Sequence, residues 1–131
     1  MSVDMRTFEN IRSLMGARFI NTIKYFLEDG AKAVSAIEEG QRGGDAAAMV
    51  LPAHTLKTEA RQLGAYNLGD LCDDIEQCAR HLVETQERPD DLLTKVAQLR
   101  AQFRDVTTIF QRETNPLQQP CQKAVFGRAA R

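Results

Sequence analysis

Apolar residues recur every three to four positions along most of the chain, which is the spacing of one face of an α-helix. No segment stands out with the alternating β-branched pattern of a strand. The pattern predicts five helices, at about residues 7–15, 18–39, 45–63, 67–86 and 89–113. Their expected inward faces are, in chain order, Phe8, Ile11, Leu14 and Met15; Phe19, Ile20, Ile23, Phe26, Leu27, Ala33, Val34 and Ile37; Met49, Leu56, Ala60 and Leu63; Leu68, Leu71, Cys72, Ile75, Ala79 and Leu82; and Leu92, Leu93, Val96, Leu99, Phe103, Val106 and Phe110.

Capping and breaking residues set the expected helix boundaries. Thr7, Asp45 and Asn67 can cap the first, third and fourth helices, and Pro89 suits the first turn of the fifth. The expected interruptions are Gly16, a loop at Gly40, Gly43 and Gly44, then Gly64, and finally Arg88-Pro89-Asp90. Short connections between long amphipathic helices favour antiparallel neighbours. We therefore expect an all-α protein: an antiparallel four-helix bundle with a short additional N-terminal helix over residues 1–114, and a flexible C-terminal tail over residues 115–131.

Composition and charge narrow the class of protein. The 131 residues suit one domain, and a net charge of −1 gives no electrostatic reason to bind a nucleic-acid backbone. No apolar run approaches the roughly 20 residues that cross a bilayer, and the N-terminus lacks the apolar core of a signal peptide, so a cytoplasmic location is expected. The three cysteines are an odd number at spacings that suit neither a disulfide framework nor a zinc site.

The third predicted helix holds the one segment with a chemical interpretation. A helical wheel places its apolar residues on one side: Met49, Leu56, Ala60 and Leu63. His54 falls on the opposite, outer side, and five residues lie within about 60° of it: Val50, Leu51, Lys57, Thr58 and Arg61. The wheel therefore predicts an exposed histidine surrounded by two cations, a hydroxyl and two apolar side chains.

These residue types suit transfer of a phosphoryl group. A neutral imidazole has a lone pair that can attack phosphorus, and histidine is largely neutral near pH 7. Lys57, one helical turn after His54, can neutralise charge on the phosphoryl oxygens, and Arg61 can add a second, more distant cation. Phosphoryl transfer depends mainly on positioning and charge stabilisation, so a small module suffices when its partner supplies the metal and an aspartate.

The chain contains two neighbouring runs, His54-Thr55-Leu56-Lys57 and Ala60-Arg61-Gln62-Leu63-Gly64-Ala65. Together they resemble the signature of the histidine-containing phosphotransfer (HPt) domain family. The following helix, with Leu68, Leu71, Cys72 and Ile75-Glu76, is also similar to that of the family, and the helix pattern extends the resemblance over about residues 5–113.

The resemblance implies an antiparallel four-helix bundle with a short leading helix. It assigns the phosphoacceptor to His54 and the family's helper lysine to Lys57. Such domains exchange a phosphoryl group with an aspartate of a response-regulator receiver domain, have no ATP site and do not autophosphorylate. The implied partners are receiver domains and also a hybrid histidine kinase. No cofactor of its own is expected, since a divalent metal such as Mg²⁺ belongs to the receiver. We expect a monomer that binds neither nucleic acid nor membrane.

The sequence departs from the family's pattern directly after Lys57. The next position is usually glycine and the one after it is usually small, whereas this chain has Thr58 and Glu59. Thr58 could narrow the choice of partner, slow transfer or hydrogen-bond a phosphoryl oxygen. This departure keeps open a non-catalytic module that docks receiver or kinase domains without accepting phosphate. A more remote alternative is a helical adaptor in which His54 is incidental. Pro52, just before His54, could kink the helix or begin its regular part.

The other candidate residues favour structural interpretations. Phe8, Ile11 and Met15 are expected to seal one end of the bundle, although they could join Val50 and Leu51 in a docking rim. His81 is expected on the surface. The acidic stretch of Asp70, Asp73, Asp74 and Glu76 is interpreted as a solvated helix face. A di-metal carboxylate bundle would need Glu-x-x-His pairs on two helices, and the sequence contains none.

Overall fold

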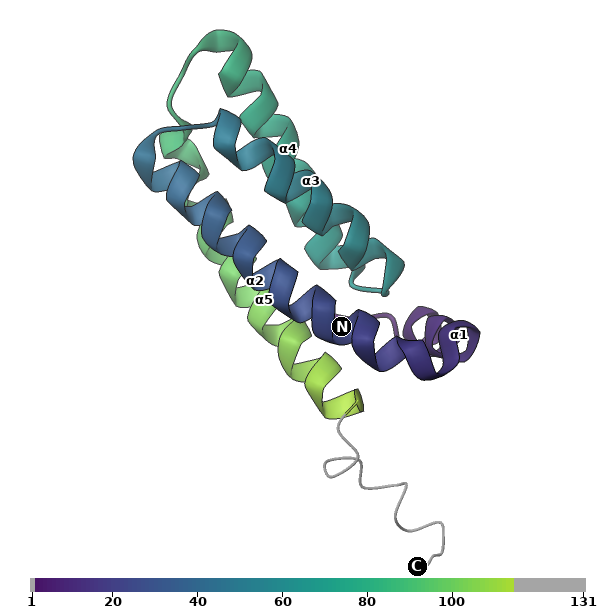
Figure 1. Ribbon diagram of the computed structural model, residues 1–131. Helices are drawn as coiled ribbons and strands as arrows, with labels where there is room; N and C mark the ends of the chain where they lie inside the picture. The colour runs from purple at the N-terminus through teal and green to yellow at the C-terminus, as the bar shows by residue number, and fades with distance from the viewer. Residues whose placement is uncertain (1, 115–131) are drawn as a thin grey trace, which may run out of the picture.

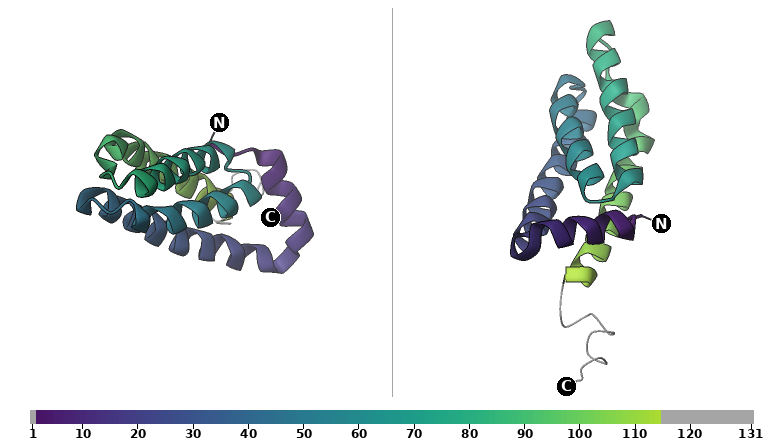
Figure 2. Two further views of the ribbon diagram at one scale, coloured as in Figure 1. Left: turned by 90° about the horizontal axis from the view of Figure 1, so that it is seen from above. Right: turned by 90° about the vertical axis from the view of Figure 1, so that its right-hand side faces the viewer.

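The computed structural model describes residues 2–114, and within that range it is helical without strands. The elements are α1 (Met5–Met15), the 3₁₀ turn η1 (Gly16–Arg18), α2 (Phe19–Gly43), α3 (Ala47–Gln62), α4 (Tyr66–Thr85), the 3₁₀ turn η2 (Pro89–Leu92) and α5 (Leu93–Thr114). Helices α2 to α5 form an antiparallel bundle, and α1 lies across one end of it (Figures 1 and 2). The predicted fold class is confirmed for the described residues. The predicted tail, residues 115–131, lies outside them.

The first helix begins earlier than the sequence pattern predicted. Asp4, rather than Thr7, caps it, because the Asp4 Oδ1 accepts hydrogen bonds from the backbone N–H groups of Arg6 and Thr7 at 3.0 and 3.3 Å. The helix ends at Gly16, whose φ of 60° lies in a region that favours glycine. The predicted interruption at Gly16 is therefore confirmed, whereas the predicted cap was wrong.

The predicted glycine loop begins too early in the chain. Helix α2 continues through Gly40 to Gly43 and ends at Gly44, which has a φ of 74°. Gly40 is buried against α3, where a β-carbon would lie 2.7 Å from the Met49 Cγ. The glycine thus allows a close approach of two helices instead of ending one. Asp45 does cap the start of α3, since its Oδ1 accepts the Ala48 N–H at 3.1 Å.

Helix α3 runs through Pro52 without ending, as the prediction of a helix over residues 45–63 required. Two other boundaries differ slightly from the prediction. Helix α4 begins at Tyr66, so Asn67 is its second residue and not its cap. The segment from Pro89 begins with a 3₁₀ turn, and the α-helix starts only at Leu93.

The core lies between the four long helices and extends under α1. Phe8 is fully buried, with its ring centroid 5.1 Å from that of Phe19 and 5.1 Å from that of Phe110. The expected sealing of the bundle end by α1 is therefore confirmed. Three residues assigned to inward faces are instead exposed, because they stand at the margins of their stripes: Leu14, Ile20 and Leu93.

Helices α2 and α5 approach closely at Gly30. A β-carbon there would lie 2.5 Å from the Phe103 Cε1, so the ring fills the space that any larger residue would need. None of the described helices has the length and apolar character needed to span a bilayer.

Candidate functional site

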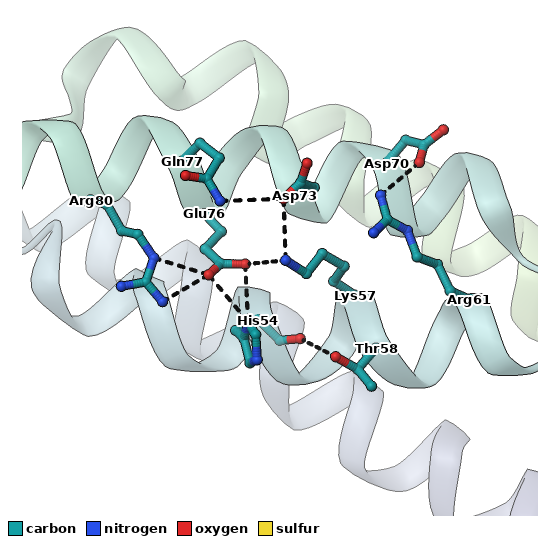
Figure 3. Close-up of polar contacts among 9 residues, drawn as sticks. All are labelled: His54, Lys57, Thr58, Arg61, Asp70, Asp73, Glu76, Gln77 and Arg80. Carbon is teal, nitrogen blue, oxygen red and sulfur yellow. Dashed lines mark hydrogen bonds and ion pairs between the residues drawn. The ribbon is translucent and has the colours of Figure 1, made fainter.

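His54 lies in the middle of α3, on the face that this helix shares with α4 (Figure 3). Its side chain is 50% exposed, as the helical wheel predicted. The Nδ1 atom faces the carboxylate of Glu76 on α4, at 3.2 Å from Oε2 and 3.3 Å from Oε1. His54 stands at the boundary between core and solvent: the residue before it, Ala53, is fully buried, and the residue after it, Thr55, is exposed.

Glu76 is a buried carboxylate with cationic partners on two helices. Its side chain is only 3% exposed. The Lys57 Nζ lies 2.8 Å from Oε1, and Arg80 donates to Oε2 from Nη2 at 2.8 Å and from Nε at 3.0 Å. Burial by itself would raise the pKa of Glu76, but hydrogen bonds from Lys57, Arg80 and His54 outweigh it and lower the pKa to about 2. Glu76 is therefore ionised at neutral pH.

The ionised carboxylate determines which nitrogen of His54 carries the proton. A carboxylate can only accept hydrogen bonds, so the Nδ1 atom that faces it must be the donor. In the neutral imidazole, Nε2 then carries the lone pair. The site thus presents a half-exposed histidine in the tautomer whose Nε2 is free to act as a nucleophile.

Lys57 lies on the flank of α3 that faces α4, and not on the outer face as the helical wheel suggested. Its side chain is only 14% exposed, and its Nζ also lies 3.2 Å from the Asp73 Oδ1. Hydrogen bonds from its ammonium group to Glu76 and then Asp73 raise the pKa of Lys57. Asp73 accepts a further hydrogen bond from Gln77 at 3.4 Å. Lys57 is therefore a charged link between the two helices.

The remaining predicted site residues surround His54 at different depths. Leu51 is exposed and Val50 is half-buried. Thr58 is exposed, and its hydroxyl donates to the His54 carbonyl oxygen at 3.2 Å. Arg61 forms an ion pair with Asp70 at 2.9 Å, separate from the Glu76 cluster (Figure 3). Of the predicted site residues, the structure thus brings Lys57 into contact with the Glu76 carboxylate, which also contacts His54. Val50, Leu51, Thr58 and Arg61 lie around His54 without contacting that carboxylate.

Sequence reasoning missed Glu76, which contacts His54, and Arg80, which pairs with Glu76. Glu76 was interpreted as part of a solvated acidic face, which is wrong, because it is buried against α3. Its position contained a signal: it follows Cys72 by four residues and lies beside Ile75, both on the buried stripe of α4. Arg80 follows Glu76 by four residues, the spacing of a helical ion pair. His81 is exposed, as predicted.

No cluster of histidine, cysteine, aspartate and glutamate side chains suited to a metal ion occurs within residues 2–114. Cys72 is buried, and burial raises the pKa of its thiol to about 12, so it is held as an unreactive thiol.

Comparison with known protein families identifies the kind of protein to which this site belongs. The sequence model of the Hpt domain matches residues 22–106, which include His54, Lys57, Glu76 and Arg80. The chain belongs to the Hpt domain family. This membership gives it a histidine phosphotransfer role in a phosphorelay, as a carrier of phosphoryl groups and not as an ATP-using kinase.

A solved structure supports the Hpt fold. The crystal structure of histidine-containing phosphotransfer protein B (HptB) from Pseudomonas aeruginosa PAO1 matches with a TM-score of 0.74 and 22% sequence identity. The match covers 86% of this chain and 93% of that one. Among curated proteins, no sequence matches this Hpt chain significantly.

Proposed function

We propose that this protein is a phosphorelay intermediate in which His54 accepts a phosphoryl group from the aspartate of one receiver domain and passes it to another. The observation that carries the proposal is the contact between the His54 Nδ1 and the ionised, buried Glu76, which leaves the lone pair on Nε2 of this half-exposed side chain. Among the described residues, His81 has no comparable carboxylate contact, so the arrangement is specific to His54.

The transfer step balances without a cofactor bound to this chain. The Nε2 lone pair attacks the phosphorus of the receiver's aspartyl phosphate, an N–P bond forms, and the bond from phosphorus to the aspartate oxygen breaks. The proton on Nδ1 stays in place, because Glu76 accepts its hydrogen bond throughout. Glu76 also stabilises the positive charge that develops on the imidazole. The divalent metal of this reaction, such as Mg²⁺, is expected in the receiver.

Lys57 and Arg80 support the same step from both sides of Glu76. They hold its carboxylate with their charged groups, and in this way they position His54. Their charges also offset part of the negative charge that the phosphoryl group brings to this face. Lys57 thus keeps the helper role that the sequence suggested, and Arg80, whose side chain is largely exposed, joins it.

The receiver is expected to dock on the surface around His54. Leu51 and Val50 provide apolar contacts on one side, and Arg61 provides a charge on the other. Thr58 offers its methyl group to the partner, because its hydroxyl is engaged with the carbonyl of His54. A receiver that approaches closely must accommodate this methyl group, which glycine would not present.

The test uses phosphorylated receiver domains encoded in the same genome as this protein. Each receiver, carrying labelled phosphate, is incubated with the protein. We expect acid-labile label on the wild-type chain and none on His54→Ala, whereas His81→Ala, which removes the other histidine, should accept label normally. Return of the label from the purified phosphoprotein to a second receiver tests the relay.

The non-catalytic alternative predicts a different result. If no cognate receiver transfers label, yet His54→Ala retains affinity for a receiver and retains signalling, the protein is a docking module and the relay proposal is wrong. The observation that favours this alternative is the exposed Thr58, with its hydroxyl engaged, at the position where the family usually has glycine.

A further inference from the structure

A groove opens between α1, α2 and α3, away from the contact of His54 with Glu76. It has a volume of about 540 Å³ and is lined by Ile11, Leu14 and Met15 of α1, Tyr25 and Phe26 of α2, Glu59 of α3, and Leu63 just after α3, among others. Leu14 and Tyr25 are 80% and 61% exposed. Large apolar side chains gathered around one groove are unusual on a solvent-exposed protein surface, and they indicate a site where another segment or molecule binds.

The groove also contains a carboxylate, that of Glu59, which has no cationic partner among the residues that the structure describes. Burial raises the pKa of Glu59, and the neighbouring negative charge of Asp29 raises it further. No ion pair within residues 2–114 includes Glu59. An occupant that brings apolar side chains together with a lysine or arginine would therefore suit both the walls of the groove and its charge.

The chain itself contains a segment of this chemistry. Residues 115–131 carry three basic residues and no acidic one, and the apolar run Ala124-Val125-Phe126 stands between Lys123 and Arg128. Since the whole chain has a net charge of −1 and this segment has +3, residues 1–114 carry −4. The segment and the bundle are thus complementary in charge.

The described part of the chain ends against α1, the helix that forms one wall of the groove. Helix α5 ends at Thr114, and the Arg12 Nη2 on α1 donates a hydrogen bond to the Glu113 carbonyl oxygen at 2.8 Å. Leu14 is two residues after Arg12, about 3 Å along the helix axis and about 200° around it, so the segment must pass around α1 to reach the groove. The twelve residues from Thr114 to Phe126 can span up to about 40 Å, which is ample to reach the groove.

We propose that residues 123–128 dock in the groove of their own chain, with Phe126 against Leu14 and Tyr25 and a flanking basic residue near Glu59. The short tether raises the effective concentration of the segment to the order of millimolar, so even weak intrinsic affinity gives substantial occupancy. The occupied groove borders the side of α3 that carries Glu59 and Gln62.

The experiment compares full-length proteins by two-dimensional NMR and does not involve phosphate, so its outcome is independent of the proposed relay function. Phe126→Asp should shift the signals of Leu14, Tyr25 and Gln62 while the circular dichroism stays unchanged. Gln119→Asp adds the same charge to the segment without removing the aromatic ring, and should leave these signals in place. Glu59→Gln should move the signals of Leu14 and Tyr25 part of the way toward their Phe126→Asp positions, because it removes only the charge complement.

Two results would overturn the proposal. If the wild type and Phe126→Asp give superimposable signals at Leu14 and Tyr25, the segment does not occupy the groove. If the shifts occur but grow with protein concentration, the groove binds the segment of a second copy, and docking within one chain is wrong.

Discussion

Replacement of Glu76 by glutamine tests whether this residue sets the tautomer of His54. The side chain keeps its size, but the amide can either donate to Nδ1 or accept from it, so the preference for a proton on Nδ1 is lost. Hydrogen bonds to charged groups contribute about 1.5–3 kcal/mol. The Nδ1 to oxygen distances of 3.2 and 3.3 Å are longer than those of the strongest charge-assisted bonds, and His54 is half-exposed, so the lower end of this range applies.

A loss of about 1.4 kcal/mol corresponds to about a tenfold change in the ratio of the two tautomers. Nitrogen NMR of the imidazole, recorded at a pH where it is neutral, measures this ratio directly. Transfer of label from a phosphorylated receiver in a single turnover should slow by a similar factor. Asp74→Asn is the matched control, because Asp74 lies on the same helix but pairs with Lys95, away from His54. An unchanged tautomer ratio in Glu76→Gln, with a transfer rate within twofold of wild type, would refute the reasoning.

Three further predictions concern stability and charge. The pKa of Glu76 in the folded protein is about 2, which is below its value in an unfolded chain. The stability that ionised Glu76 contributes is therefore complete above about pH 4.5 and is lost as the pH falls toward 2. The difference in urea stability between wild type and Glu76→Gln should shrink over that pH range. Gly30→Ala should lower the free energy of unfolding by about 1 kcal/mol. A clash with Phe103 costs about 1–3 kcal/mol, which exceeds the gain of about 1 kcal/mol in helix propensity. In the same urea titration Gly43→Ala should not destabilise the protein, because a β-carbon at Gly43 meets no atom within 4 Å. Lys57→Ala should slow transfer and also lower the melting temperature measured by circular dichroism, because it removes a cation from buried Glu76; a melting temperature equal to that of wild type would show that Lys57 does not support Glu76.

The buried face of α3 could be predicted from the sequence, because the spacing of apolar residues within one helix is enough to identify that face. Met49, Leu56, Ala60 and Leu63 are all buried, and His54 is exposed, as the wheel placed them. Leu14, Ile20 and Leu93 were misplaced because a residue at the margin of a stripe is buried or exposed according to where the next helix lies. That position depends on packing between helices, which the periodicity of one segment does not contain.

The charge network could not be predicted for a related reason. A glutamate in a run of acidic residues is usually solvated, and Glu76 becomes a buried partner only because α3 brings Lys57 and His54 against it. The sequence identifies the nucleophile from its own helix. The residue that orients it comes from the next helix. The stripe of α4 indicates that Glu76 is buried, but only the packing of α3 on α4 shows that it meets His54.

The aromatic cluster under α1 has a consequence for where the domain can be cut. The segment that matches the Hpt domain begins at residue 22, after Phe8 and Phe19, both of which are buried in the cluster with Phe110. Excision at that family boundary would remove Phe8, which packs against both Phe19 and Phe110, and open the end of the bundle to water. We therefore expect the unit that folds, and that can be transferred intact into another signalling protein, to start near the Asp4 cap of α1 and to be longer than the segment by which its family is recognised.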